Sequence, residues 1–94
     1  MKFGIMNLFP LSEGQSEREV IEETMEEAVL ADTLGFDSFW FAEHHFSGYG
    51  ILGNPIQFGT AVAMATKRIT IGTAVMVVPF YNPMRLAEDA ALLD

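Results

Sequence analysis

Apolar residues along the chain gather in short, nearly continuous runs that alternate with longer segments of mixed apolar and polar character. The short runs predict buried β-strands over residues Lys2–Phe9, Asp37–Ala42 and Ile69–Val78. The third run is β-branched through much of its length and ends before Pro79. We therefore expect this strand to be buried on both faces of a sheet.

An amphipathic helix is predicted after the first strand, over Glu17–Leu34. Ser16 followed three residues later by Glu19 has the spacing of a capping box, and Gly35 suits a left-handed C-cap. Seven of the 13 carboxylates lie between Glu17 and Asp32. We interpret this acidic run as a solvated outer helix face rather than a docking surface. The apolar positions at helical spacing are Ile21, Met25, Ala28 and Ala31.

Two further helices are predicted from a shared start signal, an Asn N-cap followed by Pro at the first helical position. Asn54-Pro55 introduces a helix over Ile56–Thr66, and Asn82-Pro83 introduces one over Met84–Asp94. The first of these two helices has no charged side chain. We expect it to be covered on all sides, either by other helices of the same chain or by a second subunit.

Strand and helix therefore alternate three times, which is typical of an α/β fold with parallel strands joined by right-handed crossovers. A (β/α)₈ barrel needs about 250 residues, so three such units cannot close one. The sheet would keep open, apolar edges. We expect residues 1–94 to form a single partial domain that belongs to a larger chain, although an open sheet that needs a partner is the alternative.

Composition narrows the classes of function. Thirteen acidic residues against five basic ones give a formal net charge of −8, which argues against nucleic-acid or anionic-membrane partners. The chain has no cysteine, and hence no disulfide, thiolate nucleophile or thiolate metal site. No apolar run approaches the ~20 residues that span a bilayer. We therefore expect a soluble, cytoplasmic protein.

The densest polar cluster is Glu43-His44-His45-Phe46, directly after the second predicted strand. Carboxyl ends of parallel strands form the functional face of such sheets. A metal site is disfavoured because the chain has only two histidines. A histidine beside a carboxylate suits proton transfer, whereas the alternative is that one or both rings simply form hydrogen bonds with the backbone at the strand end. Because adjacent side chains of an extended backbone point apart, we expect only one imidazole in the site.

Small residues mark the third strand, at Gly72-Thr73-Ala74-Val75. They would let a flat ligand or another backbone approach closely, but ordinary interior packing explains them equally well. No phosphate-binding glycine loop is present, because Gly48, Gly50 and Gly53 lack the dinucleotide spacing.

Several short motifs follow one another in the order found in a known family. They are Lys2-Phe3-Gly4, Gly35-Phe36-Asp37, Glu43-His44-His45-Phe46, Leu52-Gly53-Asn54-Pro55, Arg68-Ile69, Gly72-Thr73-Ala74, Pro79, Asn82-Pro83, Ala87-Glu88-Asp89 and Leu93-Asp94. With this order and spacing the chain resembles the N-terminal third of the bacterial luciferase-like flavin monooxygenases, and among them the luciferase alpha subunit.

The resemblance implies a (β/α)₈ TIM barrel, of which this chain supplies the three N-terminal β/α units and ends before closure. It implies monooxygenation with reduced FMN, which a separate flavin reductase delivers, and with O₂, through a C4a-hydroperoxyflavin that attacks an aldehyde-like or other small organic substrate. An F420-dependent oxidoreductase of the same superfamily and a non-catalytic flavin-binding partner subunit are the alternatives.

The resemblance also implies roles for particular residues. His44 matches the family's catalytic base, Glu43 and His45 match its neighbours in the flavin pocket, and Ala74-Val75 matches a non-proline cis peptide beside the isoalloxazine ring. Family members pair as homo- or heterodimers through their second and third helices. The family's phosphate-binding residues lie beyond residue 94, so we expect this segment alone to be inactive.

Overall fold

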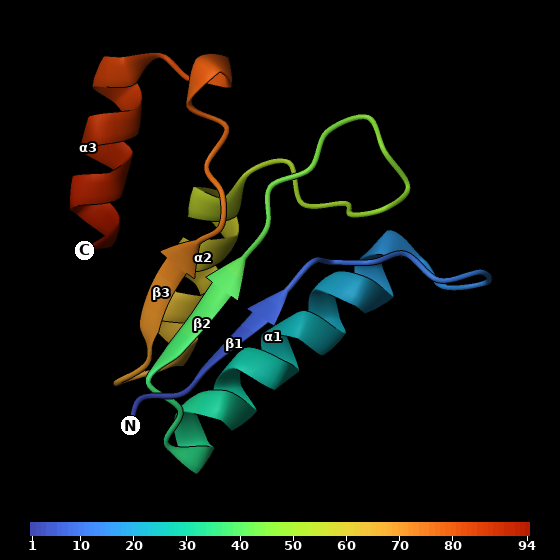
Figure 1. Cartoon of the computed structure of the whole chain (residues 1–94), viewed down its shortest axis with the longest axis vertical. Helices are drawn as coiled ribbons and strands as arrows, with labels where there is room; N and C mark the ends of the chain where they lie inside the picture. Colours follow the sequence, from blue (N-terminus) through green and yellow to red (C-terminus); the bar gives the residue numbers. More distant parts are fainter.

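A computed structural model describes all residues, 1–94, and it contains one parallel sheet of three strands (Figure 1). The strands are β1 (Gly4–Asn7), β2 (Ser38–Phe41) and β3 (Thr70–Thr73), and they lie in the order β1-β2-β3. Both pairs, β1 with β2 and β2 with β3, are parallel. The predicted alternation of parallel strands and helices is confirmed, although each strand is shorter than its apolar run.

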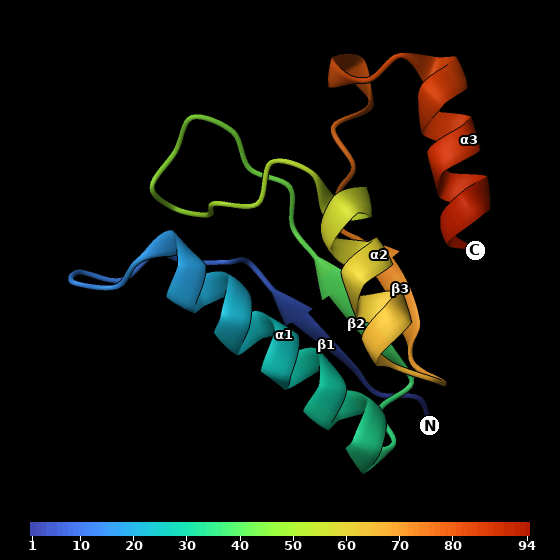
Figure 2. The same cartoon turned by 180° about the vertical axis from the view of Figure 1, so that it is seen from behind.

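Helix α1 (Glu17–Leu34) connects β1 to β2, and α2 (Pro55–Ala65) connects β2 to β3. Both helices cover the same face of the sheet, as the two opposite views show (Figures 1 and 2). A short 3₁₀ helix, η1 (Val78–Phe80), follows β3 and leads to α3 (Pro83–Leu93), which packs against α2. None of these helices has both the length and the apolar character that crossing a lipid bilayer requires.

The helix starts are confirmed in atomic detail. The Ser16 hydroxyl accepts a hydrogen bond from the backbone N–H of Glu19 at 3.2 Å, and the Glu19 carboxylate accepts one from the backbone N–H of Ser16 at 2.7 Å. These bonds hold the pKa of Glu19 below its usual range. Gly35 ends α1 with φ of 87°, in the left-handed region that a side chain disfavours. Asn54 and Asn82 cap the other two helices through their side-chain oxygens.

The core lies between the sheet and helices α1 and α2. Phe39 and Phe41, alternate residues of β2, point to this side and are fully buried. Phe41 and Phe58 of α2 meet edge to face at 5.0 Å between ring centroids, and Phe9 meets Phe58 in the same way at 5.0 Å. This aromatic cluster packs α2 against the sheet near the carboxyl-terminal ends of the strands, next to the loops that follow them.

No element of the chain covers the other face of the sheet. Met6, Trp40 and Gly72 are register partners there, and the Trp40 side chain is 39% exposed. The indole lies over Gly72, where an added Cβ would come within 2.3 Å of the ring. Gly72 is therefore required because the Trp40 ring occupies the space of a side chain.

The prediction for the third strand is wrong in two respects. The strand ends at Thr73 instead of Val78: the N–H of Ala74 still bonds to the Phe41 carbonyl, but those of Val77 and Val78 bond outside the ladder, to the Glu43 carboxylate and the Met76 carbonyl. No residue of β3 is buried. Burial on both faces fails because helices lie on only one side of the sheet.

The acidic face of α1 is mostly exposed, as interpreted, but Asp32 departs from that description. Its carboxylate accepts hydrogen bonds from the backbone N–H groups of Lys67, Arg68 and Ile69 at 3.1, 3.0 and 2.9 Å. Desolvation raises the pKa of Asp32, but these three donors and the charge of Arg68 outweigh it and hold the pKa below its usual range. Asp32 thus fixes the turn that leads into β3.

Candidate functional site

All five residues that the sequence singled out lie at the carboxyl-terminal edge of the sheet, beyond the arrowheads of the strands in Figure 1. Glu43, His44 and His45 follow β2, whereas Ala74 and Val75 follow β3. The backbone N–H of Ala74 donates to the carbonyl of Phe41 at 2.8 Å, which holds the two connections side by side. This is the edge at which parallel α/β proteins place their functional groups.

Glu43 is a buried carboxylate, with only 6% of the residue exposed. Its Oε1 lies 2.6 Å from Nε2 of His45, and its Oε2 accepts a hydrogen bond from the backbone N–H of Val77 at 2.7 Å. No lysine or arginine pairs with it. A buried carboxylate needs partners to offset the loss of hydration, and here the imidazole is the one partner able to carry a positive charge.

His45 is held on several sides. Besides the Glu43 contact, its ring meets Phe80 edge to face at 4.7 Å between centroids. A Cβ added at Gly53 would lie 3.7 Å from its Cε1, so the ring sits against that glycine. The next residue, Phe46, is fully exposed with φ of 54°, and the chain turns sharply away from the site there.

His44 has different neighbours from His45. Its ring meets Tyr49 at 5.2 Å between centroids, and its Nδ1 is buried without a hydrogen-bond partner. An added Cβ at Gly50 would come within 2.6 Å of that nitrogen and 2.5 Å of the carbonyl oxygen of Leu8. Glycine at position 50 therefore makes room for the His44 ring. Which of the two imidazoles faces a barrel mouth stays a prediction.

The Ala74-Val75 peptide bond is cis, as the resemblance implied. Ala74 is half-buried, and the Val75 side chain is exposed. Gly72, Thr73 and Ala74 have no large side chain of their own, although the Trp40 indole lies over Gly72. A flat aromatic ring could lie here, with the imidazoles of the neighbouring loop at its edge. The residues present therefore fit a flavin, and they are the ones that could hold its ring.

Sequence reasoning missed Tyr81. Its hydroxyl is buried and meets no acceptor with hydrogen-bond geometry. Burial, and after it the proximity and charge of the Glu43 carboxylate, raise the pKa of Tyr81 to about 12. The available signal was position, because Tyr81 follows β3 at the same edge as Glu43.

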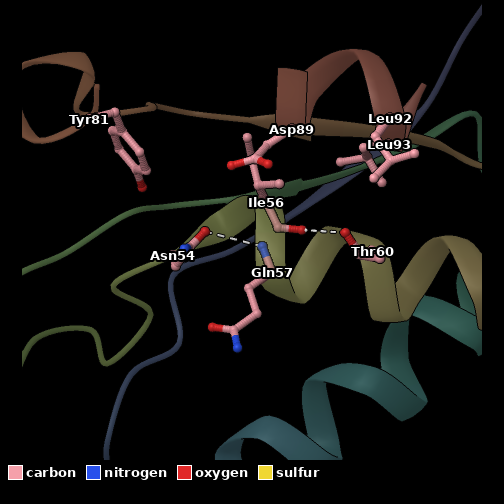
Figure 3. A pocket seen from close by; sticks show the side chains of 8 residues that line it. All are labelled: Asn54, Ile56, Gln57, Thr60, Tyr81, Asp89, Leu92 and Leu93. Atoms are coloured by element: carbon pink, nitrogen blue, oxygen red, sulfur yellow. Dashed lines mark hydrogen bonds between the residues drawn. The ribbon is translucent and has the colours of Figure 1, made fainter. Parts of the chain in front are cut away.

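Tyr81 also lines a hollow of about 380 Å³ between α2 and α3 (Figure 3). In the close-up, Asn54, Ile56, Gln57 and Thr60 belong to the start of α2, while Asp89, Leu92 and Leu93 come from α3. The lining includes none of Glu43, His44 and His45. The hollow is thus separate from the histidine cluster, with Tyr81 between the two. No group of three or more potential metal ligands gathers anywhere in the chain.

Comparison with known proteins identifies the family of this chain. The profile of the family described as luciferase-like monooxygenase matches residues 1–94, the whole chain. The alkanal monooxygenase alpha chain of Photorhabdus laumondii is 38% identical over 94 residues, which make up 100% of this chain and 26% of that relative. The chain therefore spans about a quarter of the length of the curated relatives that it matches.

Two solved structures represent two cofactor classes. The oxygenating constituent of 3,6-diketocamphane monooxygenase from Pseudomonas putida, in complex with FMN, matches with a TM-score of 0.92 at 28% identity and covers 99% of this chain and 26% of that one. An F420-dependent secondary alcohol dehydrogenase, in complex with an F420-acetone adduct, matches with a TM-score of 0.62 at 26% identity, over 95% and 27% of the two chains.

Proposed function

The chain belongs to the luciferase-like monooxygenase family, and from that premise we propose that it forms the N-terminal β/α units of a (β/α)₈ flavin-dependent monooxygenase. The observation that carries the proposal is the meeting of Glu43, His44 and His45 with Ala74-Val75 at one edge of a parallel sheet. Acid–base groups there stand next to a stretch of small residues that a flat cofactor can approach.

Reduced FMN, delivered by a transiently bound flavin reductase, would supply the activation of O₂. Ala74 and Val75 would contact the flavin ring, and Glu43 and His45 would form the adjoining wall. His44 would act as the base that moves a proton near the flavin, a role for which imidazole is the most common side chain. The substrate would be an aldehyde or another small organic molecule, and the 94 residues alone would not turn over.

FMN is favoured over F420 by the closer structural match. The FMN-bound relative has a TM-score of 0.92 and the F420-dependent one 0.62. The third alternative, a non-catalytic flavin-binding partner subunit, is disfavoured by the presence of His44, because such a subunit has no need of a base.

The experiment is a cofactor titration of the full-length protein. Reduced FMN and reduced F420 are added separately without oxygen, and binding is followed by the change in flavin or deazaflavin fluorescence. Oxygen uptake with a series of aliphatic aldehydes then follows. We expect FMN binding and substrate-dependent oxygen uptake. Binding of F420 alone, with hydride transfer to or from an alcohol, would replace the proposal by the F420 alternative.

We further propose that subunits pair through α2 and α3. Ala61 and Met64 of α2 are exposed, and Met64 retains 85% of its accessible surface. Ile56 and Ala63, by contrast, are half-buried beside a hollow that α3 also lines. The outward surface of α2 therefore lies around Ala61 rather than Ala63.

A charge placed on this surface should prevent pairing. We expect Ala61→Glu in the full-length protein to sediment as a monomer, because a carboxylate would lose its hydration in the interface. Leu30→Glu, which adds the same charge at an exposed position of α1, is the matched control and should stay dimeric. A parent protein that is itself monomeric at micromolar concentration would contradict the proposed pairing.

A further inference from the structure

Glu43 joins two connections that follow different strands. It belongs to the β2 connection, and so does His45, which its Oε1 contacts at 2.6 Å. Its Oε2 accepts from Val77, in the connection that follows β3, at 2.7 Å. Both carboxylate oxygens are thus in use, and the side chain itself is completely buried. Loss of either contact would leave a buried charge with one partner fewer.

The Glu43 contact also determines which nitrogen of His45 carries a proton. An ionised carboxylate can only accept hydrogen bonds. At 2.6 Å, the Nε2 atom of His45 must therefore be the donor, in the neutral ring as well as in the charged one. Nδ1 is left as the nitrogen that can gain or lose a proton. A neutral histidine without this contact would have no such restriction.

We propose that Glu43 is a positioning residue, which fixes the proton-bearing nitrogen of His45 and holds the segment from Val77 to Tyr81 against the end of β2. The inference deepens the proposed function, on which it rests for its relevance to flavin binding. Both oxygens of the Glu43 carboxylate are engaged by His45 and Val77, so in this scheme the carboxylate supports the wall of the flavin site and acts on the reacting atoms only through His45. The Phe80 ring and Gly53 then keep the imidazole in the plane that Glu43 selects.

Glu43→Gln gives a decisive test, because the side-chain amide has one acceptor and one donor group and can satisfy its two neighbours in only one orientation. The amide oxygen must accept from the Val77 N–H, since an NH₂ group cannot. The NH₂ group then faces Nε2 of His45 and donates to it, so the proton of a neutral ring must move to Nδ1. The variant keeps the shape and the Val77 contact while it reverses the tautomer of His45.

The measurement is ¹⁵N NMR of histidine-labelled full-length protein, at a pH where the ¹⁵N shifts themselves show the rings to be neutral. Residues 1–94 contribute only the signals of His44 and His45, and the signal that is lost in His45→Asn identifies His45. We expect a proton on Nε2 of His45 in the parent and on Nδ1 in Glu43→Gln. Glu27→Gln, which alters a carboxylate bonded to Asn7 instead, should leave the parental pattern.

Two results would overturn the inference. One is a parent in which Nε2 of His45 is unprotonated, which decides the matter even if Glu43→Gln fails to fold. The other is a folded Glu43→Gln with the parental tautomer. A titration with reduced FMN adds a second readout, in which the variant should bind several-fold more weakly than Glu27→Gln. If the parent itself binds no FMN, the proposed function fails, while the tautomer comparison still decides this inference.

Discussion

A carboxylate that accepts hydrogen bonds from the backbone of another segment lies at each end of the strands. The two carboxylates differ in whether backbone N–H groups are their only partners. Where the strands begin, the Asp32 carboxylate accepts hydrogen bonds from three backbone N–H groups. At the edge where they end, Glu43 accepts one backbone donor and contacts an imidazole, beside a tyrosine hydroxyl that has no partner.

The difference separates a carboxylate that fixes a turn from one that we propose to be functional. The hydrogen-bond donors to the Asp32 carboxylate are amide N–H groups, which do not dissociate at physiological pH, so they stabilise only its ionised form. Glu43 meets groups that can exchange protons. This contrast agrees with the general division of parallel α/β proteins, in which one edge of the sheet stabilises the fold and the other carries the chemistry.

The largest expected effect tests whether the chemistry is confined to one edge. His44→Ala in the full-length protein should lower oxygen-dependent turnover by about 10² to 10⁴, the usual contribution of acid–base catalysis. Asp32→Asn should leave turnover within a few-fold of the parent at a temperature where it is folded. Steady-state oxygen uptake measures both. An equal loss of turnover in His44→Ala and Asp32→Asn would contradict the idea that the chemistry is confined to one end of the strands.

Asp32→Asn should instead lower the melting temperature, because its NH₂ group would face the N–H of Lys67 in place of an acceptor. The pKa of Asp32 is lowered by folding. Its stabilising contribution is therefore present above the unfolded value of about 3.9 and is lost as pH falls through the lower folded value. Calorimetry should show that the difference in melting temperature between the parent and Asp32→Asn becomes smaller below about pH 4. Glu22→Gln, at an exposed ion pair, should produce no such difference.

The smallest effect concerns the titration of Tyr81, whose pKa is raised to about 12. The unfolded phenol ionises near pH 10. The stability that Tyr81 contributes is thus present below pH 10 and is lost as pH rises toward 12. Absorbance at about 295 nm should show that Glu43→Gln lowers this pKa, since burial remains but the charge does not. The absorbance change that is lost in Tyr81→Phe is the one that belongs to Tyr81. An unchanged titration of Tyr81 in Glu43→Gln would show that the Glu43 charge does not affect its pKa.

Local sequence signals predicted the helices well. The capping box at Ser16 and the Asn-Pro pairs placed the helix starts almost to the residue, because each depends on contacts within four positions. The strand after Arg68 was overestimated because the last residues of its apolar run bond elsewhere: the N–H of Val77 donates to Glu43, 34 residues earlier in the chain. No periodicity contains that information.

The site was predicted in part for the same reason. Position after a strand identified Glu43, His44 and His45, and the family resemblance identified Ala74-Val75. Neither route revealed the partners of each group. The contact between Glu43 and Val77, the approach of Tyr81, and the role of Asp32 beneath the sheet all join residues more than 30 positions apart. Such pairs depend on how the strands align, which only the folded sheet determines.

Trp40 gives the uncovered face of the sheet a built-in optical reporter. It is the one tryptophan within residues 1–94, and its indole lies on that face with 39% of the residue exposed. Whatever comes to cover the face must change the polarity around this ring, so its emission maximum should move to shorter wavelength. Intrinsic fluorescence can therefore follow the covering of this surface in real time, without any label.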